Sequence, residues 1–331
     1  MEYDLFKDML SIDSTSGLER ELAEWLLEHL QAPAKELMEV GDGTLNLFLK
    51  WGTPKVVFCT HMDTVPPYIP PTFDGKVWRG RGTCDAKGQL FAMYTACKQL
   101  EADGCTDFGL LLLAGEETGS WGAKAFSKTG FTAPYLIVGE PTGNRMVTAS
   151  KGTKSYDLKF TGEAFHSGYP QYGVSAVDLF NEFYDRLKAF EFPVDPELGE
   201  TTWNVGLLRS DNPQNVLSPE LTCKVYFRTT FASDAVVERF FADAQNDRLS
   251  VTARGGDRPA RYFTLPGFDS GPVAFGSDAP HLTGFAHKAI CGPGSIRTAH
   301  RSDECLSAAD LEHAVRLYKE MYRFMQLSIN K

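Results

Sequence analysis

The chain has 331 residues, 43% of them hydrophobic, which is enough for two domains with substantial cores and argues against disorder. Asp and Glu outnumber Lys and Arg by 43 to 33, and a formal charge of −10 argues against nucleic acid or an anionic membrane as a partner. The acidic start and the lack of any run of about 20 apolar residues predict neither a signal peptide nor a membrane span. Seven scattered cysteines without a CxxC pair predict reduced thiols and a cytoplasmic location.

The first 150 residues have the pattern of an α/β domain. Helical spacing covers residues 2–11 and 18–30. The segments "KVVFCTH", "DFGLLLLAGEE" and "APYLIVGEPT" carry continuous apolar runs, typical of strands buried on both faces, and "GQLFAMYTACKQLEADG" between the first two reads as a helix. This alternation predicts a largely parallel central sheet layered with helices.

Residues 151–258 have a different pattern, which predicts an inserted domain. Strands and helices are expected there in the order βαββαβ, as in a ferredoxin-like unit. From residue 259 the chain returns to buried strands and tight turns, and a long helix follows. We therefore expect a discontinuous larger domain of residues 1–150 and 259–331, with 151–258 inserted in it.

Acidic and imidazole side chains follow the ends of the predicted strands or lie in glycine-rich loops beside them: His61, Asp63, Asp85, Glu116, Glu117, Glu140 and His300. Each motif alone is commonly a strand-end polar pair or a solvated loop. Together they would meet at the carboxyl edge of the sheet, where ligands bind in open α/β folds. Adjacent carboxylates resist burial unless cations compensate them, and carboxylate with imidazole suits zinc, cobalt or manganese. The conjunction favours a metal site.

The segments "THMDTVP", "GRGTCDAKG", "AGEETGSWGA", "VGEPT" and "AHRSDE" give the chain a resemblance to a known family. The chain resembles the zinc aminoacylases and peptidases that include acetylornithine deacetylase, succinyl-diaminopimelate desuccinylase and carboxypeptidase G, and most of all acetylornithine deacetylase. The resemblance implies a zinc-hydrolase catalytic domain (1–150 and 259–331) and a ferredoxin-like lid and dimerisation domain (151–258).

The resemblance also implies two Zn²⁺ ions per chain, with Co²⁺ or Mn²⁺ as substitutes. Asp85 would bridge the ions, His61 and Glu140 would complete one, and Glu117 and His300 the other. Asp63 would orient the ring of His61 through its second nitrogen. Glu116 would be the general base that takes a proton from water and passes it to the leaving amine.

Further roles are implied for residues outside the ligand set. His166 in "GEAFHSGYPQYGVSA" resembles a lid histidine that, in dimeric relatives, reaches the partner's active site and binds the developing oxyanion. A surface histidine in a glycine-rich turn is the alternative, but the surrounding pattern favours the catalytic role. Asn215 and Arg228 would hold the substrate's α-carboxylate, although Arg228 is equally well a strand-edge charge. Gly294 and Ser295 in "CGPGS" would offer backbone N–H groups to the same carboxylate.

These implications predict a metal-dependent hydrolase that cleaves the amide bond of an N-acyl amino acid. N-Acetylornithine or N-succinylornithine deacylation in arginine biosynthesis is the favoured reaction. Succinyl-diaminopimelate desuccinylase, N-acetyl-lysine deacetylase and a carboxypeptidase or dipeptidase remain alternatives. A binding scaffold without activity is the non-enzyme alternative, and Glu116 argues against it. Cys59 and Cys84 are soft metal ligands or, more in keeping with their neighbours, core fillers.

Overall fold

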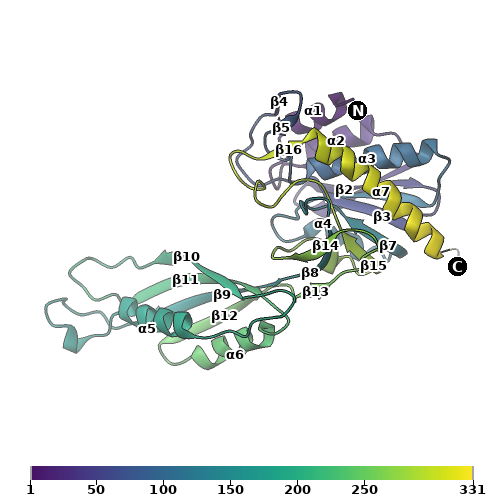
Figure 1. The fold of residues 1–331 in the computed structure, drawn as a ribbon. Coiled ribbons are helices and arrows are strands. Elements are labelled where there is room, and N and C mark those ends of the chain that lie inside the picture. Colours follow the sequence, from purple (N-terminus) through teal and green to yellow (C-terminus); the bar gives the residue numbers. More distant parts are fainter. Residues whose placement is uncertain (1, 330–331) are drawn as a thin grey trace. The chain divides into compact units, whose positions relative to one another are not determined.

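The computed structural model describes residues 2–329, and the chain forms two compact units (Figure 1). The first unit comprises Met1–Thr148, Tyr262–Gly271 and Ser277–Lys331. The second comprises Ala149–Arg261 and Pro272–Gly276. The segment Pro272–Gly276, which the sequence pattern assigns to the larger domain, therefore belongs to the second unit.

A six-stranded sheet forms the centre of the first unit, in the order β1 (Ala34–Gly41), β2 (Thr44–Trp51), β6 (Phe108–Leu113), β3 (Val56–His61), β7 (Ala133–Val138) and β15 (Phe285–Ile290). Strands β6, β3, β7 and β15 are parallel, whereas β1 and β2 are antiparallel to each other and β2 to β6. The sheet is therefore mixed: the expectation of parallel strands holds for these four, and both pairings of β2 are antiparallel. Only Asp42 and Gly43 connect β1 to β2, both at positive φ (50° and 81°), and so short a turn joins only antiparallel strands.

Helices cover both faces of this sheet (Figure 1): α1 (Asp4–Ser11), α2 (Arg20–His29), α3 (Lys87–Ala102) and α7 (Ala308–Ile329) on one, and α4 (Trp121–Ser127) on the other. Because successive side chains of a strand point to opposite faces of the sheet, alternate residues of β2 pack against the two helix layers. Leu47 and Leu49 pack in the core with the four helices, and the ring of Phe48 meets that of Phe126 in α4 at 5.6 Å. Burial on both faces explains the continuous apolar runs of the strands.

Short elements complete the first unit and its connections to the second. One small sheet has the order β16 (Cys305–Ser307), β5 (Val77–Arg79), β4 (Thr72–Phe73), and another has β13 (Ala260–Arg261), β8 (Met146–Ser150), β14 (Ser270–Val273). A 3₁₀ turn, η2, spans Ala279–His281. All seven cysteines are free thiols. Within residues 2–329, no helix has the length and apolar character needed to cross a membrane.

The second unit contains β9 (Gly152–Thr161), η1 (Pro170–Tyr172), α5 (Ala176–Ala189), β10 (Thr202–Arg209), β11 (Glu220–Thr229), α6 (Asp234–Ala244) and β12 (Leu249–Gly255). Its four strands form an antiparallel sheet in the order β10-β11-β9-β12. Along β11, Val225 and Phe227 pack in a core with α5 and α6, and the intervening Tyr226 and Arg228 face away from that core. The main strands and helices follow the predicted order βαββαβ.

Candidate metal centre

His61 is the last residue of β3 and is almost fully buried. Its Nδ1 lies 2.9 Å from the main-chain oxygen of Asp63, and its Nε2 lies 3.1 Å from Oδ1 of Asp85. Because a carbonyl only accepts, Nδ1 carries the proton in the neutral ring, and the lone pair of Nε2 faces Asp85. Burial alone would lower the pKa of His61, but hydrogen bonds with Asp63 and Asp85 outweigh it and raise that pKa well above its usual value.

Asp85 lies between two histidines that come from distant parts of the chain. Its Oδ1 faces His61, and its Oδ2 lies 3.2 Å from Nε2 of His300, which in turn lies 2.8 Å from Oε1 of Glu117. Burial would raise the pKa of Asp85, but the hydrogen bonds with His300 and His61 hold it well below its usual value. The carboxylate of Asp85 thus has one oxygen directed to each half of the site.

Two more carboxylates lie beside this group, Glu140, which is buried, and Glu116, which is half-buried. Glu140 follows β7 and is 4% exposed, and its Oε1 has no hydrogen-bond partner within residues 2–329. Burial raises the pKa of Glu140 well above its usual value, and the charges of Glu116 and Asp85 add to the effect. Burial likewise raises the pKa of Glu116, reinforced by Asp278, Glu117 and Asp85. The site therefore holds more negative charge than its histidines balance.

Asp63 contacts the site differently from the expectation. Its carboxylate lies 3.4 Å from Nδ1 of His61, farther than its own main-chain oxygen, which accepts from that nitrogen. Oδ1 accepts the N–H of Glu116 at 3.0 Å, and Oδ2 accepts the N–H of Glu117 at 3.2 Å and the hydroxyl of Ser16 at 2.8 Å. The Asp63 carboxylate consequently fixes the main chain that carries both Glu116 and Glu117, while its carbonyl orients His61.

The loops around Asp85 are tightly packed. Lys87 is buried, and its Nζ donates to the carbonyls of Met9 (3.0 Å) and Ile12 (2.6 Å), which ties the loop to the end of α1. Gly294 has φ of +79°, and a Cβ there would lie 2.6 Å from Sγ of Cys84. Cys84 in turn donates to the carbonyl of Ser295 at 3.5 Å. Gly294 and Ser295 therefore adjoin the Asp85 loop, and their role toward a substrate carboxylate stays a prediction.

The donor set and its spacing fit divalent metal ions. Two donors bound to one tetrahedral zinc ion at about 2.05 Å are separated by about 3.3 Å, close to the 3.1 and 3.2 Å separations between Asp85 and the two histidines. Single donor atoms of His61, Asp85 and Glu117 lie within 4.8 Å of one another. A cation would also satisfy the unpartnered oxygen of Glu140. Cys59 and Cys84 are fully buried, and burial raises the pKa of Cys84 to about 12, so these thiols are core fillers rather than ready ligands.

The second unit carries the remaining predicted residues, and the structure brings only two of them together. His166 pairs with Val216, and the N–H of Ser167 donates to the carbonyl of Asn215 at 2.9 Å, so His166 and Asn215 occupy adjacent exposed loops. Both loops lie beyond the Glu220 end of β11, whereas Arg228 is near its other end, about 26 Å away at 3.3 Å per residue. Asn215 and Arg228 of one chain therefore do not hold the same carboxylate, contrary to the expectation.

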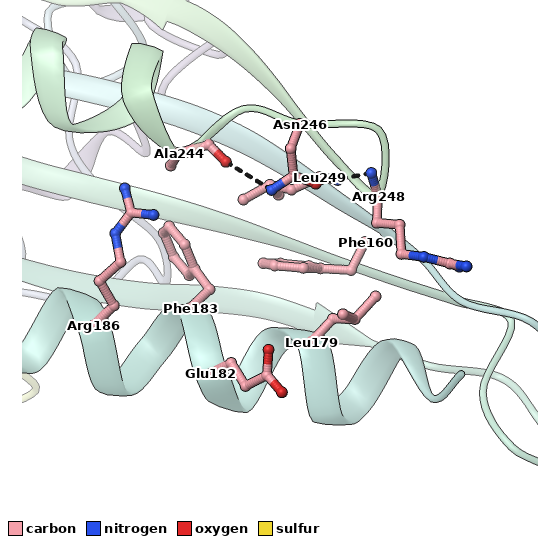
Figure 2. Close-up of a pocket in the computed structure, with 9 residues that line it drawn as sticks. All are labelled: Phe160, Leu179, Glu182, Phe183, Arg186, Ala244, Asn246, Arg248 and Leu249. Atoms are coloured by element: carbon pink, nitrogen blue, oxygen red, sulfur yellow. Dashed lines mark hydrogen bonds between the residues drawn. The ribbon is translucent and has the colours of Figure 1, made fainter. Parts of the chain in front are cut away.

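The second unit also has a surface pocket between α5 and the turn that precedes β12 (Figure 2). Phe160, Leu179 and Phe183 form apolar walls, and the guanidinium groups of Arg186 and Arg248 lie at its rim. None of the predicted site residues lines it. The pocket is therefore separate from the candidate metal centre.

Comparison with known families matches residues 57–323 to the model described as peptidase family M20/M25/M40. The chain belongs to this family. It is accordingly a hydrolase. A peptidase M20 domain-containing protein of Schizosaccharomyces pombe is 31% identical over 339 residues, which cover 97% of this chain and 84% of the relative. A probable carboxypeptidase of Aspergillus flavus is 30% identical over 366 residues, covering 95% and 85%.

Solved structures of M20 enzymes share the fold. A tripeptidase from Staphylococcus aureus has a TM-score of 0.79 at 18% identity and covers 96% of this chain and 97% of its own. A metallo-carboxypeptidase from Sulfolobus solfataricus has a TM-score of 0.75 at 17% identity, covering 97% and 98%. The relatives are thus named as peptidases, and a particular likeness to acetylornithine deacetylase is not among these findings.

Three further buried residues, Asp278, Arg81 and Glu304, lie close to the centre, and the motifs did not predict a role for them. Asp278 is 2% exposed, Ser120 donates a hydrogen bond to it, and its Oδ1 has no partner within residues 2–329. Burial raises the pKa of Asp278 to about 6. Arg81 and Glu304 form a buried ion pair behind Asp85. Arg81 and Glu304 lie within the segments "GRGTCDAKG" and "AHRSDE", and their place in these segments was the sequence signal that could have found them.

Proposed function

We propose that this chain is a metal-dependent peptidase that hydrolyses the amide bond of a short peptide or N-acyl amino acid bearing a free α-carboxylate. The observation that carries the proposal is the Asp85 carboxylate, whose two oxygens face His61 and His300 with Glu116 beside them. His61, Asp85 and Glu140 would hold one ion, and Asp85, Glu117 and His300 the other. Two Zn²⁺ are proposed, with Co²⁺ or Mn²⁺ as substitutes.

Bound ions would supply a water of lowered pKa and an electrophile for the amide oxygen. The chain's own residues do the rest. Glu116 accepts the proton of the attacking water and returns it to the nitrogen of the leaving amine. Asp63 holds Glu116 for this task through the Glu116 N–H, and the protonated Nδ1 of His61 keeps Nε2 free for a ligand bond.

His166 is proposed to stabilise the negative charge that develops on the amide oxygen. Its Nδ1 accepts the N–H of Gly168 at 3.0 Å, so the proton of the neutral ring is on Nε2. The ring is exposed and can donate that proton in a hydrogen bond to an oxyanion. This tautomer supports a catalytic role over that of an incidental surface histidine.

A homodimer through the second unit is also proposed. Arg228 has no carboxylate partner in the described part of the chain, and its guanidinium lies 5.2 Å from the ring centre of Tyr226. Because Arg228 and the His166–Asn215 loops are at opposite ends of β11, they could contact one substrate only if two copies contribute them. In this arrangement one chain supplies Arg228, and its partner supplies His166 and Asn215.

The substrate class rests on the relatives, which are named carboxypeptidases and a tripeptidase. Deacylation of N-acetylornithine or N-succinylornithine, with a place in arginine biosynthesis, remains a narrower candidate for the same centre. The cytoplasmic location remains a prediction from the free thiols.

The test is a hydrolysis panel with the purified protein and added Zn²⁺ or Co²⁺. It compares di- and tripeptides, the same peptides as C-terminal amides, and acetyl-, succinyl- and formyl-amino acids including N-acetylornithine. We expect cleavage of free acids and little cleavage of the matched amides. Equal rates on acids and amides would show that the enzyme does not require a free α-carboxylate. Failure to cleave any member of the panel would contradict the proposed peptidase function.

A further inference from the structure

A buried ion pair lies directly behind the metal centre. Nη1 of Arg81 is 2.5 Å from Oε2 of Glu304, and the two side chains are 2% and 0% exposed. Arg81 belongs to the glycine-rich loop that carries Asp85, and Glu304 follows the loop that carries His300. Neither residue belongs to the proposed ligand set. A pair buried this completely is costly to desolvate, and its presence at this place requires a reason.

Glu304 holds the main chain at Asp85. Its Oε1 accepts the N–H of Cys84 at 2.9 Å and that of Asp85 at 3.1 Å, and its Oε2 faces Arg81. Because donors already occupy both oxygens, Glu304 is not available as a metal ligand. Fixing the Asp85 N–H limits the directions in which the Asp85 side chain can point. The observed direction is the one in which its two oxygens face His61 and His300.

Arg81 extends the contact to two more loops. Its Nη1 also donates to the carbonyl of Arg301 at 3.2 Å, next to His300. Its Nε donates to the carbonyl of Pro67 at 3.3 Å, in the segment that follows Asp63. The ion pair therefore contacts three separate segments of the chain. They are the segment after β3 and His61, the Asp85 loop before α3, and the His300 loop that leads toward α7.

We propose that the Arg81–Glu304 pair is a positioning device that fixes the Asp85 main chain between the two histidine loops, so that Asp85 can bridge two metal ions. The inference rests on the proposed metal centre. It predicts that loss of the pair weakens metal binding even in protein that is fully folded. If the pair merely stabilised the fold, its loss would lower the melting temperature and leave the metal affinity of the folded protein unchanged.

The experiment compares Glu304→Gln with wild type and with a matched control, Asp195→Asn. Asp195 is a buried carboxylate of the second unit that accepts three main-chain N–H groups, from Glu197, Leu198 and Ala232. In Glu304→Gln, the amide oxygen can still accept the N–H groups of Cys84 and Asp85. The amide NH₂ then faces the guanidinium of Arg81, and two donors cannot form a hydrogen bond with each other. We expect both variants to melt at lower temperature than wild type when metal-free.

Metal affinity then separates the two roles. Zn²⁺ titrations in competition with a chromogenic chelator should show affinity about 10–100-fold weaker for Glu304→Gln and unchanged for Asp195→Asn. The visible absorption of the Co²⁺ form should also change only for Glu304→Gln. Folded Glu304→Gln with wild-type Zn²⁺ affinity and Co²⁺ spectrum would overturn the inference. If wild type itself binds no metal, the proposed metal centre fails instead.

A second variant covers the case in which Glu304→Gln does not fold. Arg81→Lys keeps the positive charge beside Glu304 but not the fork that also reaches Pro67 and Arg301. We expect Arg81→Lys to fold and to bind Zn²⁺ more weakly than wild type. Its loss of Zn²⁺ affinity should be smaller than that expected for Glu304→Gln. Wild-type Zn²⁺ affinity in folded Arg81→Lys would contradict the role given to the three-loop contact.

Discussion

Replacing Asp63 by Asn tests whether one carboxylate holds the catalytic segment in place. Its two oxygens accept hydrogen bonds from the N–H of Glu116, the N–H of Glu117 and the hydroxyl of Ser16. The amide of Asn has one acceptor oxygen and one donor nitrogen. If the nitrogen takes the Oδ1 position, it faces the Glu116 N–H, and if it takes the Oδ2 position, it faces the Glu117 N–H. The Ser16 hydroxyl can rotate, but neither N–H can.

One half-buried N–H is therefore left without an acceptor in either orientation, and the remaining bonds lose the help of a negative charge. These losses amount to about 2–3 kcal/mol. For a chain of 331 residues the metal-free melting temperature should fall by roughly 3–4 °C. One of the two N–H groups, of Glu116 or of Glu117, is no longer held, so metal affinity should weaken about 10–100-fold. His61 keeps its own hydrogen bond to the Asp63 carbonyl, and metal should still bind.

The assay combines thermal melting of the metal-free protein with Zn²⁺ titration and turnover. Ser16→Ala is the control, because it removes one donor to the same carboxylate and leaves both N–H groups paired. It should cost about 1 kcal/mol and leave metal affinity near that of wild type. His61→Ala, in contrast, should empty one metal position. If Asp63→Asn matches Ser16→Ala in melting, affinity and turnover, the Asp63 carboxylate does not position Glu116 and Glu117.

Four further outcomes are expected. Glu116→Gln should retain metal and lose turnover by about 10²–10⁴-fold or more, and normal turnover would show that the base is misassigned. Purified protein should contain up to two transition-metal ions per chain by elemental analysis, with turnover lost on chelation and restored by Zn²⁺; a fully active protein without metal contradicts the mechanism. His166→Ala should lower kcat more than it raises KM, whereas an effect on KM alone would limit His166 to substrate binding. Hydrogen bonds with Asp85 and Glu117 raise the pKa of His300 to about 10, so folded metal-free protein binds a proton that the unfolded chain releases above about pH 6.5. Its melting temperature should therefore fall between pH 6.5 and 10, and His300→Gln should flatten that decline; an unchanged slope would refute this assignment.

Strand ends were the most predictable part of the site. Continuous apolar runs located β3, β6 and β7, and the polar residues that follow them meet at one edge, since parallel strands end on the same side. His61 and Glu117 are near each other for that reason, whereas Asp85 and His300 reach them from loops that precede α3 and β16. The direction of β2 was less predictable, because its apolar run is the same in either orientation and only the Asp42-Gly43 turn decides it.

Contacts across long sequence separations were not predictable from the motifs. The partners of the Asp63 carboxylate are 47 to 54 residues away, and those of Glu304 are about 220 residues away. The motifs of Asn215 and Arg228 are close in sequence, but an extended strand separates them within one chain. A strand such as β11 rises about 3.3 Å per residue, whereas a helix rises about 1.5 Å. The strand therefore places two motifs farther apart than a helix with the same number of residues would.

The discontinuity of the first unit has a consequence for biosynthesis. The chain leaves this unit at Thr148 and returns at Tyr262, and α7, which packs against α3, begins only at Ala308. At about 5–20 residues per second, a ribosome needs roughly 10–30 s to make the residues from Thr148 to Ala308. During that time the apolar face of α3 lacks one of its layers, while the second unit, almost contiguous, is already synthesised. The nascent chain thus has a period in which a chaperone that covers the apolar surface of α3 would improve the yield of folded protein, and the proposed ligand His300 is made only near its end.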